Sequence, residues 1–237
     1  ERLSGIASFI GLNILLLFFI ITFNYEQFVE LPKATANQLA EETHERVGAV
    51  IGSIVMAIVV IMFYFKGSFN FDKKAKFLKI LAQIWVFLNA ILVISAMLKN
   101  TEYVYYLGLT YKRLGVYAFL SLAIIGLIFT FIKVSKQKTN AYLFNQMFWY
   151  VYGTILVCSF INWGGIITSH NLKREDFAAN YHFNSVDFND KQLLEYYQKT
   201  NNKEMYKILK DKIIARQNKS FLSKVLYDES ISFNESK

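Results

Sequence analysis

The sequence predicts an all-α membrane protein, a polytopic transmembrane helical bundle of five spans followed by a small helical soluble tail. Two observations lead to this prediction. Residues 1–172 hold five long apolar stretches separated by short charged clusters, and residues 173–237 are polar, with 12 Lys plus Arg and 10 Asp plus Glu. A helix needs roughly 20 apolar residues to cross the hydrocarbon core of a bilayer, and each stretch is about that long. We therefore expect a transmembrane domain over 1–172 and a tail over 173–237.

The overall composition agrees with a membrane protein. Hydrophobic residues make up 54% of the chain and charged residues only 19%, against about 25% charged in soluble domains. The net charge of +8 does not indicate a nucleic-acid partner, because Lys and Arg normally accumulate in the cytoplasmic loops of membrane proteins. The single cysteine, Cys158, lies in an apolar run and is expected to be a buried, inert thiol.

The expected spans follow from the apolar runs in chain order. They cover residues 3–23, 47–65, 80–98, 114–132 and 142–161. The fifth lies within a charge-free run, residues 139–172, that is longer than one helix needs. A run such as "AVIGSIVMAIVVIMFYF" does not alternate apolar and polar residues, as a membrane β-strand would. Helices also satisfy their own backbone hydrogen bonds in lipid, so helical spans are expected.

Charges in the loops predict the orientation of the spans. The loop 66–79 holds five Lys and one Asp, and the loop 133–138 holds three Lys and no acidic residue. Because positively charged loops stay in the cytoplasm, these two loops are expected inside the cell. The loops 24–46 and 99–113 and the C-terminal tail are then extracytoplasmic, although Lys112 and Arg113 in the third loop count against this arrangement.

The polar tail contains a predicted helix. Asn201 and Glu204 are spaced as in a capping box, which marks a helix start. Five apolar residues follow helical spacing on one or two faces: Leu194, Tyr197, Met205, Ile208 and Leu209. They fit a helical appendage that packs on itself or on the membrane surface, and they also fit a helix that docks a partner protein.

A few polar residues of the membrane domain are candidate functional residues. Asn89, in the middle of the third span, fits an interhelical hydrogen bond or a substrate ligand. Tyr111, Lys112 and Arg113 stand at a membrane boundary, where aromatic and cationic residues anchor helices or bind an anion or lipid headgroup. The cores of the five expected spans contain no carboxylate and no basic residue, which argues against a self-contained transporter.

Three residues of the expected outer face are weaker candidates. His44, Glu45 and His170 would lie on this side, with His182, Glu41 and Asp176 nearby, and histidines and carboxylates can hold zinc. However, the position four residues after His44 is Gly48, so the two-histidine motif of zinc proteases is incomplete. Phosphate-binding and nucleophile motifs are also missing from the sequence. We expect no catalytic residue, no metal and no cofactor.

Several blocks in order resemble a known family. They are "HERVGAVIGSIV", "GSFNF", "WVFLNAILVISAMLKNTEYV", "YLGLTYKRLGVYAFL", "TNAYLFNQMFWY" and "INWGGIITSHNL", with Tyr181 downstream. Together they cover about residues 44–181, and they are similar to the uncharacterised bacterial membrane proteins grouped as domain of unknown function 4173 and its relative 4153. The resemblance implies a multi-pass protein of the bacterial inner (cytoplasmic) membrane, usually with more spans upstream. It implies no reaction, cofactor or catalytic residue.

These observations lead to a ranked set of expected functions. The first is a non-enzymatic inner-membrane subunit or scaffold that binds membrane lipids and other membrane or envelope proteins, because the spans lack charge and the tail forms helices. The alternative is a transporter or lipid-handling membrane protein that uses Asn89 and the Lys112–Arg113 boundary. A receptor with a sensing tail and an outer-face metalloenzyme follow, with less support from the residues.

Overall fold

The computed structural model describes residues 2–29, 36–219 and 224–233, without the side chains of 26–29, 36–46, 68 and 73. Every regular element in these ranges is a helix, so the predicted all-α class is confirmed. The chain divides into two compact units. Unit 1 consists of Glu1–Leu107 and Lys112–Ser159, and unit 2 consists of Gly108–Tyr111 and Phe160–Lys237. The predicted boundary after Leu172 therefore falls inside unit 2.

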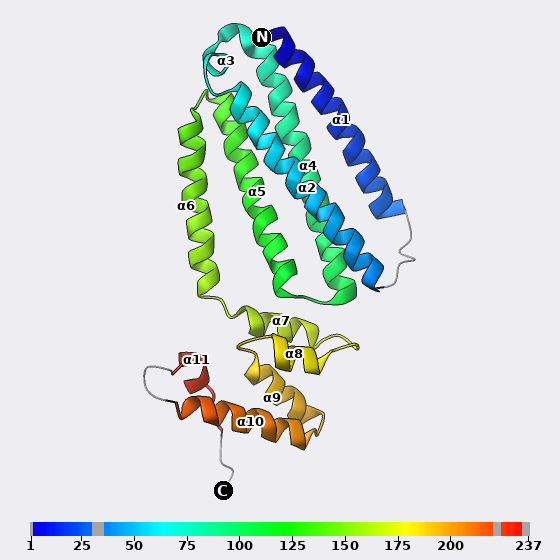
Figure 1. Cartoon of the computed structure of the whole chain (residues 1–237), viewed down its shortest axis with the longest axis vertical. Helices are drawn as coiled ribbons and strands as arrows, with labels where there is room; N and C mark the ends of the chain where they lie inside the picture. Colours follow the sequence, from blue (N-terminus) through cyan, green and yellow to red (C-terminus); the bar gives the residue numbers. More distant parts are fainter. Residues whose placement is uncertain (1, 30–35, 220–223, 234–237) are drawn as a thin grey trace. The chain divides into compact units, whose positions relative to one another are not determined.

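Unit 1 is a bundle of long helices (Figure 1). They are α1 (Arg2–Val29), α2 (Ala36–Tyr64), α4 (Lys76–Leu107), α5 (Tyr111–Ser135) and α6 (Asn140–Ser159), with the short α3 (Ser68–Phe71) and η1 (Lys73–Ala75) between α2 and α4. Among the described residues, four segments are long and apolar enough to cross a membrane: Arg2–Tyr25, Val47–Tyr64, Lys76–Leu107 and Tyr111–Ser135. The fifth helix, α6, reaches that composition only together with the following α7 (Trp163–Asn171).

The core of the bundle forms where α4 packs against α1 and α2. Phe9, Leu16, Ile54 and Leu92 are among its fully or almost fully buried side chains. In lipid, close packing and hydrogen bonds hold helices together, because the lipid tails are as apolar as the side chains. One such bond runs from the Asn13 amide to the Leu81 carbonyl oxygen (3.1 Å) and joins α1 to α4.

The third predicted loop is much shorter than expected. Helix α4 continues to Leu107, so only Gly108–Thr110 connect it to α5. The polar residues that suggested a loop remain helical because they are paired. Lys99 forms an ion pair with Glu102 at 3.0 Å, and the Asn100 amide donates to the Arg113 carbonyl oxygen at 3.2 Å. Sequence alone places the end of the span at the first charge, whereas the structure carries the helix through it.

The two lysine-rich loops meet at one end of unit 1. Lys133, expected in the fourth loop, is fully buried in α5, and its ammonium group donates to the Phe65 carbonyl oxygen at 3.0 Å. The Asn70 amide donates to the Lys138 carbonyl oxygen at 2.6 Å. Lys133 thereby satisfies one of the carbonyl groups that the C-terminal end of α2 leaves unpaired.

Unit 2 is built of short helices. After α7 come α8 (Ala179–Ser185), α9 (Asp190–Lys199), α10 (Lys203–Gln217) and α11 (Leu226–Glu229). Leu193, Tyr197, Leu209, Ile213 and Ile231 form its buried apolar core. The helical tail is thus present, with its own core. The predicted cap is displaced by one residue. Asn202, not Asn201, caps α10 by accepting from the Met205 amide, because Asn201 occupies the left-handed region at φ 54°.

Candidate functional site

A cluster of buried polar side chains lies in unit 2, and we refer to Thr168, Asn171, His182 and Asn189 as the buried network. Each is at most 7% exposed. Thr168 and Asn171 belong to α7, His182 belongs to α8, and Asn189 precedes α9. Buried polar groups are tolerated when they pair with one another, and the contacts within the network meet that condition.

Asn171 binds the backbone of the connection between α4 and α5. Its Oδ1 accepts from the Leu109 amide at 2.7 Å, and its Nδ2 donates to the Leu109 carbonyl oxygen at 2.8 Å. The preceding residue, Gly108, has φ +79°, and a Cβ there would lie 2.8 Å from the Asn171 Oδ1. Both the backbone conformation and the close approach of Asn171 therefore require glycine at position 108.

These contacts determine the protonation of His182. The Leu109 peptide fixes the orientation of the Asn171 amide, so it is an N–H group of Nδ2 that faces the His182 Nε2 at 3.2 Å. Nε2 must then be the unprotonated acceptor, and the ring proton resides on Nδ1. Nδ1 lies 2.9 Å from the Thr168 Oγ1 and donates to it. The ring is therefore neutral in this arrangement.

Surrounding groups keep His182 in this form. The Asn189 Nδ2 donates to the Thr168 Oγ1 and to the His182 carbonyl oxygen, both at 2.9 Å. The Phe177 ring stacks on the imidazole with centroids 4.7 Å apart, and Tyr181 contacts it edge-on. Burial in these surroundings lowers the pKa of His182 below its ordinary value, because a charged imidazolium would lose its hydration.

The geometry of the network supports a packing role over catalysis. The 2.9 Å separation of Thr168 and His182 is that of a nucleophile and its base. However, Thr168 is fully buried, and the proton on the His182 Nδ1 already points at the hydroxyl oxygen, so the ring cannot accept the hydroxyl proton through that nitrogen. The network instead joins α7, α8 and the segment before α9 to the Leu109 peptide.

A second set of contacts in unit 2 surrounds the carbonyl group of Asp187. The Tyr111 hydroxyl group lies 3.5 Å from this oxygen. A Cβ at Gly164 would overlap the same carbonyl group, so α7 can approach it only with glycine there. Asn162 caps α7 by accepting from the Gly165 amide (2.9 Å) and donates to the Phe188 carbonyl oxygen (2.9 Å). The glycine pair of "INWGGIITSHNL" is thus explained by close packing.

The boundary residues Tyr111, Lys112 and Arg113 have different environments. Tyr111 contacts Asp187 in unit 2, as described above. Lys112 is exposed. In unit 1 the Arg113 guanidinium donates to the Leu107 carbonyl oxygen at 2.8 Å and lies 4.0 Å from the centroid of the Tyr103 ring. Arg113 therefore closes the end of α4, a structural use of its charge.

Asn89 is fully buried in α4, and the hydrogen bond that the structure shows for it stays within that helix. Its Nδ2 donates to the Trp85 carbonyl oxygen at 2.8 Å, where an interhelical bond was expected. Its Oδ1 and the Trp85 Nε1 have no hydrogen-bond partner among the described residues. The predicted helix–helix hydrogen bond of Asn89 is therefore not among the described contacts.

Of the three outer-face candidates, the structure describes the side chain of His170. His170 is exposed, and its Nδ1 lies 3.2 Å from the Asn171 Oδ1. His44 and Glu45 fall in α2 at positions whose side chains lie outside the described residues. Within the described part of the chain, no group of three or more His, Cys, Asp or Glu side chains is placed to bind a metal ion.

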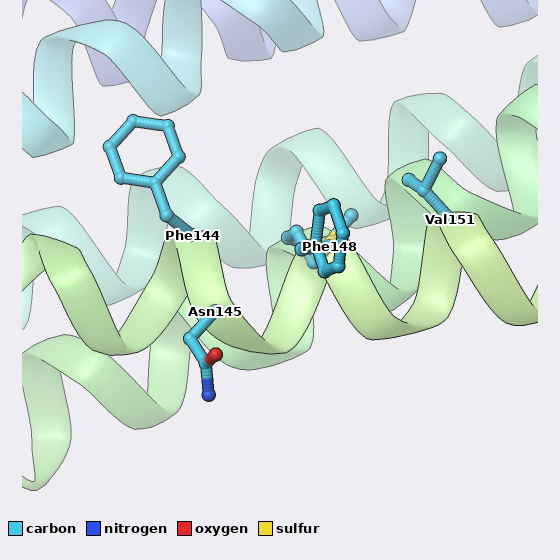
Figure 2. Close-up of a pocket in the computed structure, with 5 residues that line it drawn as sticks. Phe144, Asn145, Phe148 and Val151 are labelled. Carbon is cyan, nitrogen blue, oxygen red and sulfur yellow. The ribbon is translucent and has the colours of Figure 1, made fainter.

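Sequence reasoning did not find the buried network or two apolar features of unit 1. A cavity of about 380 Å³ lies between α2, α5 and α6. Along α6, Phe144, Asn145, Met147, Phe148 and Val151 line a shallow hollow, and Figure 2 shows Phe144 and Asn145 pointing to opposite sides of this helix. Such cavities depend on how helices pack, so the apolar runs alone could not reveal them.

Comparison with known proteins identifies the family but no function. No curated protein and no solved structure matches the chain. A family model described as a domain of unknown function (DUF4153) matches residues 1–193. The matched region extends beyond both ends of the blocks quoted above and includes all five long helices and the buried network. The chain belongs to this uncharacterised DUF4153 family.

Proposed function

We propose that this protein is a non-enzymatic subunit of the bacterial inner membrane that binds another membrane protein along α6. One observation carries the proposal. Of the twenty residues of α6, only Leu143 is buried, whereas α4 buries thirteen of its thirty-two residues. A helix that packs so little against its own chain has most of its surface available to another helix.

The exposed residues of α6 support a protein partner over lipid alone. Phe148, Trp149 and Tyr152 are 66%, 60% and 52% exposed, and they lie near the middle of the helix. Trp and Tyr in membrane helices favour the interfaces, where their polar atoms reach water. Lipid tails offer no hydrogen-bond acceptor, so a neighbouring helix with polar side chains would stabilise these residues at that depth.

The orientation proposed for the subunit places the lysine-rich loops in the cytoplasm and unit 2 outside. The hydrogen bonds of Lys133 and Asn70 support this, because they bring the second and fourth loops to the same end of unit 1. Lysine-rich loops are retained on the cytoplasmic side. Protease protection tests the orientation: cleavage of unit 2 from the cytoplasmic side would contradict it.

The partner is tested by site-specific photo-cross-linking in the membrane. A photoreactive amino acid at Trp149 or Tyr152 is expected to give a discrete protein adduct, and blue-native electrophoresis is expected to show a complex larger than the monomer. The matched control position is Phe18 of α1, which is 68% exposed and apolar. Adducts equally strong from all three positions, or migration only at monomer size, would contradict the proposal.

Substitution separates recognition from folding. The double variant Trp149→Leu and Tyr152→Leu keeps an apolar surface and removes the polar atoms, so the chain should accumulate normally. We expect this variant to lose the adduct-forming partner on copurification, whereas Phe18→Leu should keep it. Retention of the complex by the double variant would count against α6 as the binding surface.

A second function, lipid handling, is favoured by the cavity between α2, α5 and α6. The lipid-handling hypothesis derived from the sequence assigns roles to Asn89 and Arg113. The variants Arg113→Leu and Asn89→Ala test this hypothesis through measurements of growth and of the lipid profile. An unchanged lipid profile at normal protein abundance would argue against these two residues.

A further inference from the structure

The cavity between α2, α5 and α6 lies wholly within unit 1 and has apolar walls. Six of the residues that line it come in pairs from the three helices: Ile54 and Ile58, Ala123 and Gly126, and Leu143 and Met147. Members of each pair are three or four residues apart and therefore lie on the same face of their helix. The cavity is thus a groove between three helices, with walls that suit a hydrocarbon chain.

Gly126 leaves part of this volume open. A Cβ at this position would lie 3.5 Å from the terminal atoms of the Met147 side chain, which is an ordinary contact distance. Backbone packing therefore does not require glycine here, unlike at Gly164. Instead, the missing side chain contributes to the width of the groove, and a larger residue would fill it.

Hydrogen bonds join the three helices of the groove at one of its ends. The Asn140 amide donates to the Met62 carbonyl oxygen at 3.2 Å, so the start of α6 meets the C-terminal turn of α2. The buried Lys133 joins α5 to the same turn through Phe65. The three helices that form the groove are therefore fixed to one another at this end.

Exposed lysines lie at this end of the groove and give it positive charge. Lys66 follows α2, and Lys136 and Lys138 lie between α5 and α6. Asp72 is the only acidic residue in the segments 66–79 and 133–139. Lysines next to a membrane surface attract anionic lipids, at a strength equivalent to about fivefold in affinity for each lysine.

The spacing between charge and cavity matches a lipid. Ile58 and Lys66 are eight residues apart, which corresponds to roughly 12 Å along a helix. One leaflet of the hydrocarbon core is about 15 Å thick. A lipid whose phosphate lies among the lysines would therefore place the middle of an acyl chain at the level of the cavity.

We infer that the groove between α2, α5 and α6 binds one anionic phospholipid, with an acyl chain against Gly126 and the headgroup at Lys66, Lys136 and Lys138. The apolar walls select a hydrocarbon chain, and the lysines select a negative headgroup. This inference is independent of the partner proposed for α6, because Trp149 and Tyr152 do not line the cavity.

Native mass spectrometry of the purified full-length chain tests the inference. The probes are phosphatidylglycerol and phosphatidylcholine with identical acyl chains, each added to the delipidated protein in detergent. We expect one retained phosphatidylglycerol per chain and much weaker retention of phosphatidylcholine. Free glycerol phosphate should not compete, because it lacks the acyl chain. Equal retention of the two lipids, or competition by glycerol phosphate, would overturn the inference.

Substitutions test the acyl-chain part and the headgroup part of the site separately. Gly126→Leu should abolish retention of phosphatidylglycerol, and the triple variant Lys66→Gln, Lys136→Gln, Lys138→Gln should reduce it to the level of phosphatidylcholine. The control, Lys207→Gln, removes an exposed lysine of α10 in unit 2 and should change nothing. Retention unaffected in the triple variant would overturn the headgroup assignment.

A measurement on the unchanged chain covers the case in which Gly126→Leu fails to fold. Phosphatidylglycerol with a photoreactive group in the middle of its acyl chain should label peptides that contain Ile54–Ile58 or Met147. The exposed surface of α1 around Phe18 is the internal reference for ordinary lipid contact. Labelling of α1 as strong as that of α2 and α6 would overturn the acyl-chain assignment.

Discussion

In unit 2 both polar atoms of the Asn171 amide form hydrogen bonds, whereas in unit 1 only one atom of the Asn89 amide does so among the described residues. Both side chains are buried. The buried network holds four segments of chain in one arrangement, while the bundle interior depends mainly on apolar packing. The comparison indicates that loss of a polar side chain should cost more in unit 2, because each loss there leaves another buried group unpaired.

The largest expected effect concerns Arg216, which joins two buried carboxylates of unit 2. Its guanidinium lies 2.7 Å from the Asp190 carboxylate and 3.0 Å from that of Asp228. Arg216→Met leaves both carboxylates unpaired and should destabilise unit 2 by about 3 kcal/mol. Hydrogen exchange of α9–α11 peptides in detergent measures it. The control, Lys224→Met, breaks an exposed pair with Glu229 and should cost less than about 1 kcal/mol. Equal effects would contradict the prediction.

The next effect is expected for Asn171→Ala. The variant leaves the Leu109 amide and carbonyl groups buried without their partners, at a total cost of about 2 kcal/mol. Hydrogen exchange at Leu109 should accelerate accordingly. Asn184→Ala removes a hydrogen bond to the Asn180 carbonyl oxygen at an exposed site and should leave exchange at Leu109 unchanged. Slow exchange at Leu109 in Asn171→Ala would refute the assigned role.

A smaller loss of stability should occur when the pH falls, because of the buried His182. Because burial lowers its pKa in the folded state, the unfolded chain binds more protons once the pH falls below about 6.5. The contribution of neutral His182 is present above that pH and is lost as the pH falls toward the lowered folded pKa. The loss is at most about 1.4 kcal/mol per pH unit. Exchange of α7 and α8 peptides between pH 7 and 5, corrected for intrinsic rates, measures it, and His182→Gln should remove this dependence.

The smallest effect is expected in the bundle. Asn89→Leu removes one hydrogen bond within α4 together with an oxygen that has no partner among the described residues, so stability should change by only about 0.6 kcal/mol. Leu92→Ala, one turn further along α4, creates a cavity in the core and should cost about 2–5 kcal/mol. Thermal unfolding in detergent compares the two. A larger loss for Asn89→Leu than for Leu92→Ala would show that Asn89 has a partner or role beyond α4.

The sequence predicted the long helices well because each depends on a continuous apolar run. It misplaced their ends where a charge is compensated within the bundle, as with Lys99 and Glu102 or with Lys133 and the Phe65 carbonyl group. The buried network could not be predicted, since Asn171 pairs with a peptide 62 residues earlier in the chain. The block "INWGGIITSHNL" gave the only signal, an unusual density of Gly, Asn and Thr in an apolar region.

Unit 2 is formed from two separate pieces of the polypeptide, Gly108–Tyr111 and the region from Phe160 onward. A gene truncated after Ser159 would still encode the α4–α5 hairpin but would deprive its turn of Asn171. A growth defect caused by such a deletion would therefore combine a missing tail with a weakened hairpin. Complementation studies of this family should use point substitutions on exposed faces of α9 and α10, which leave the turn intact.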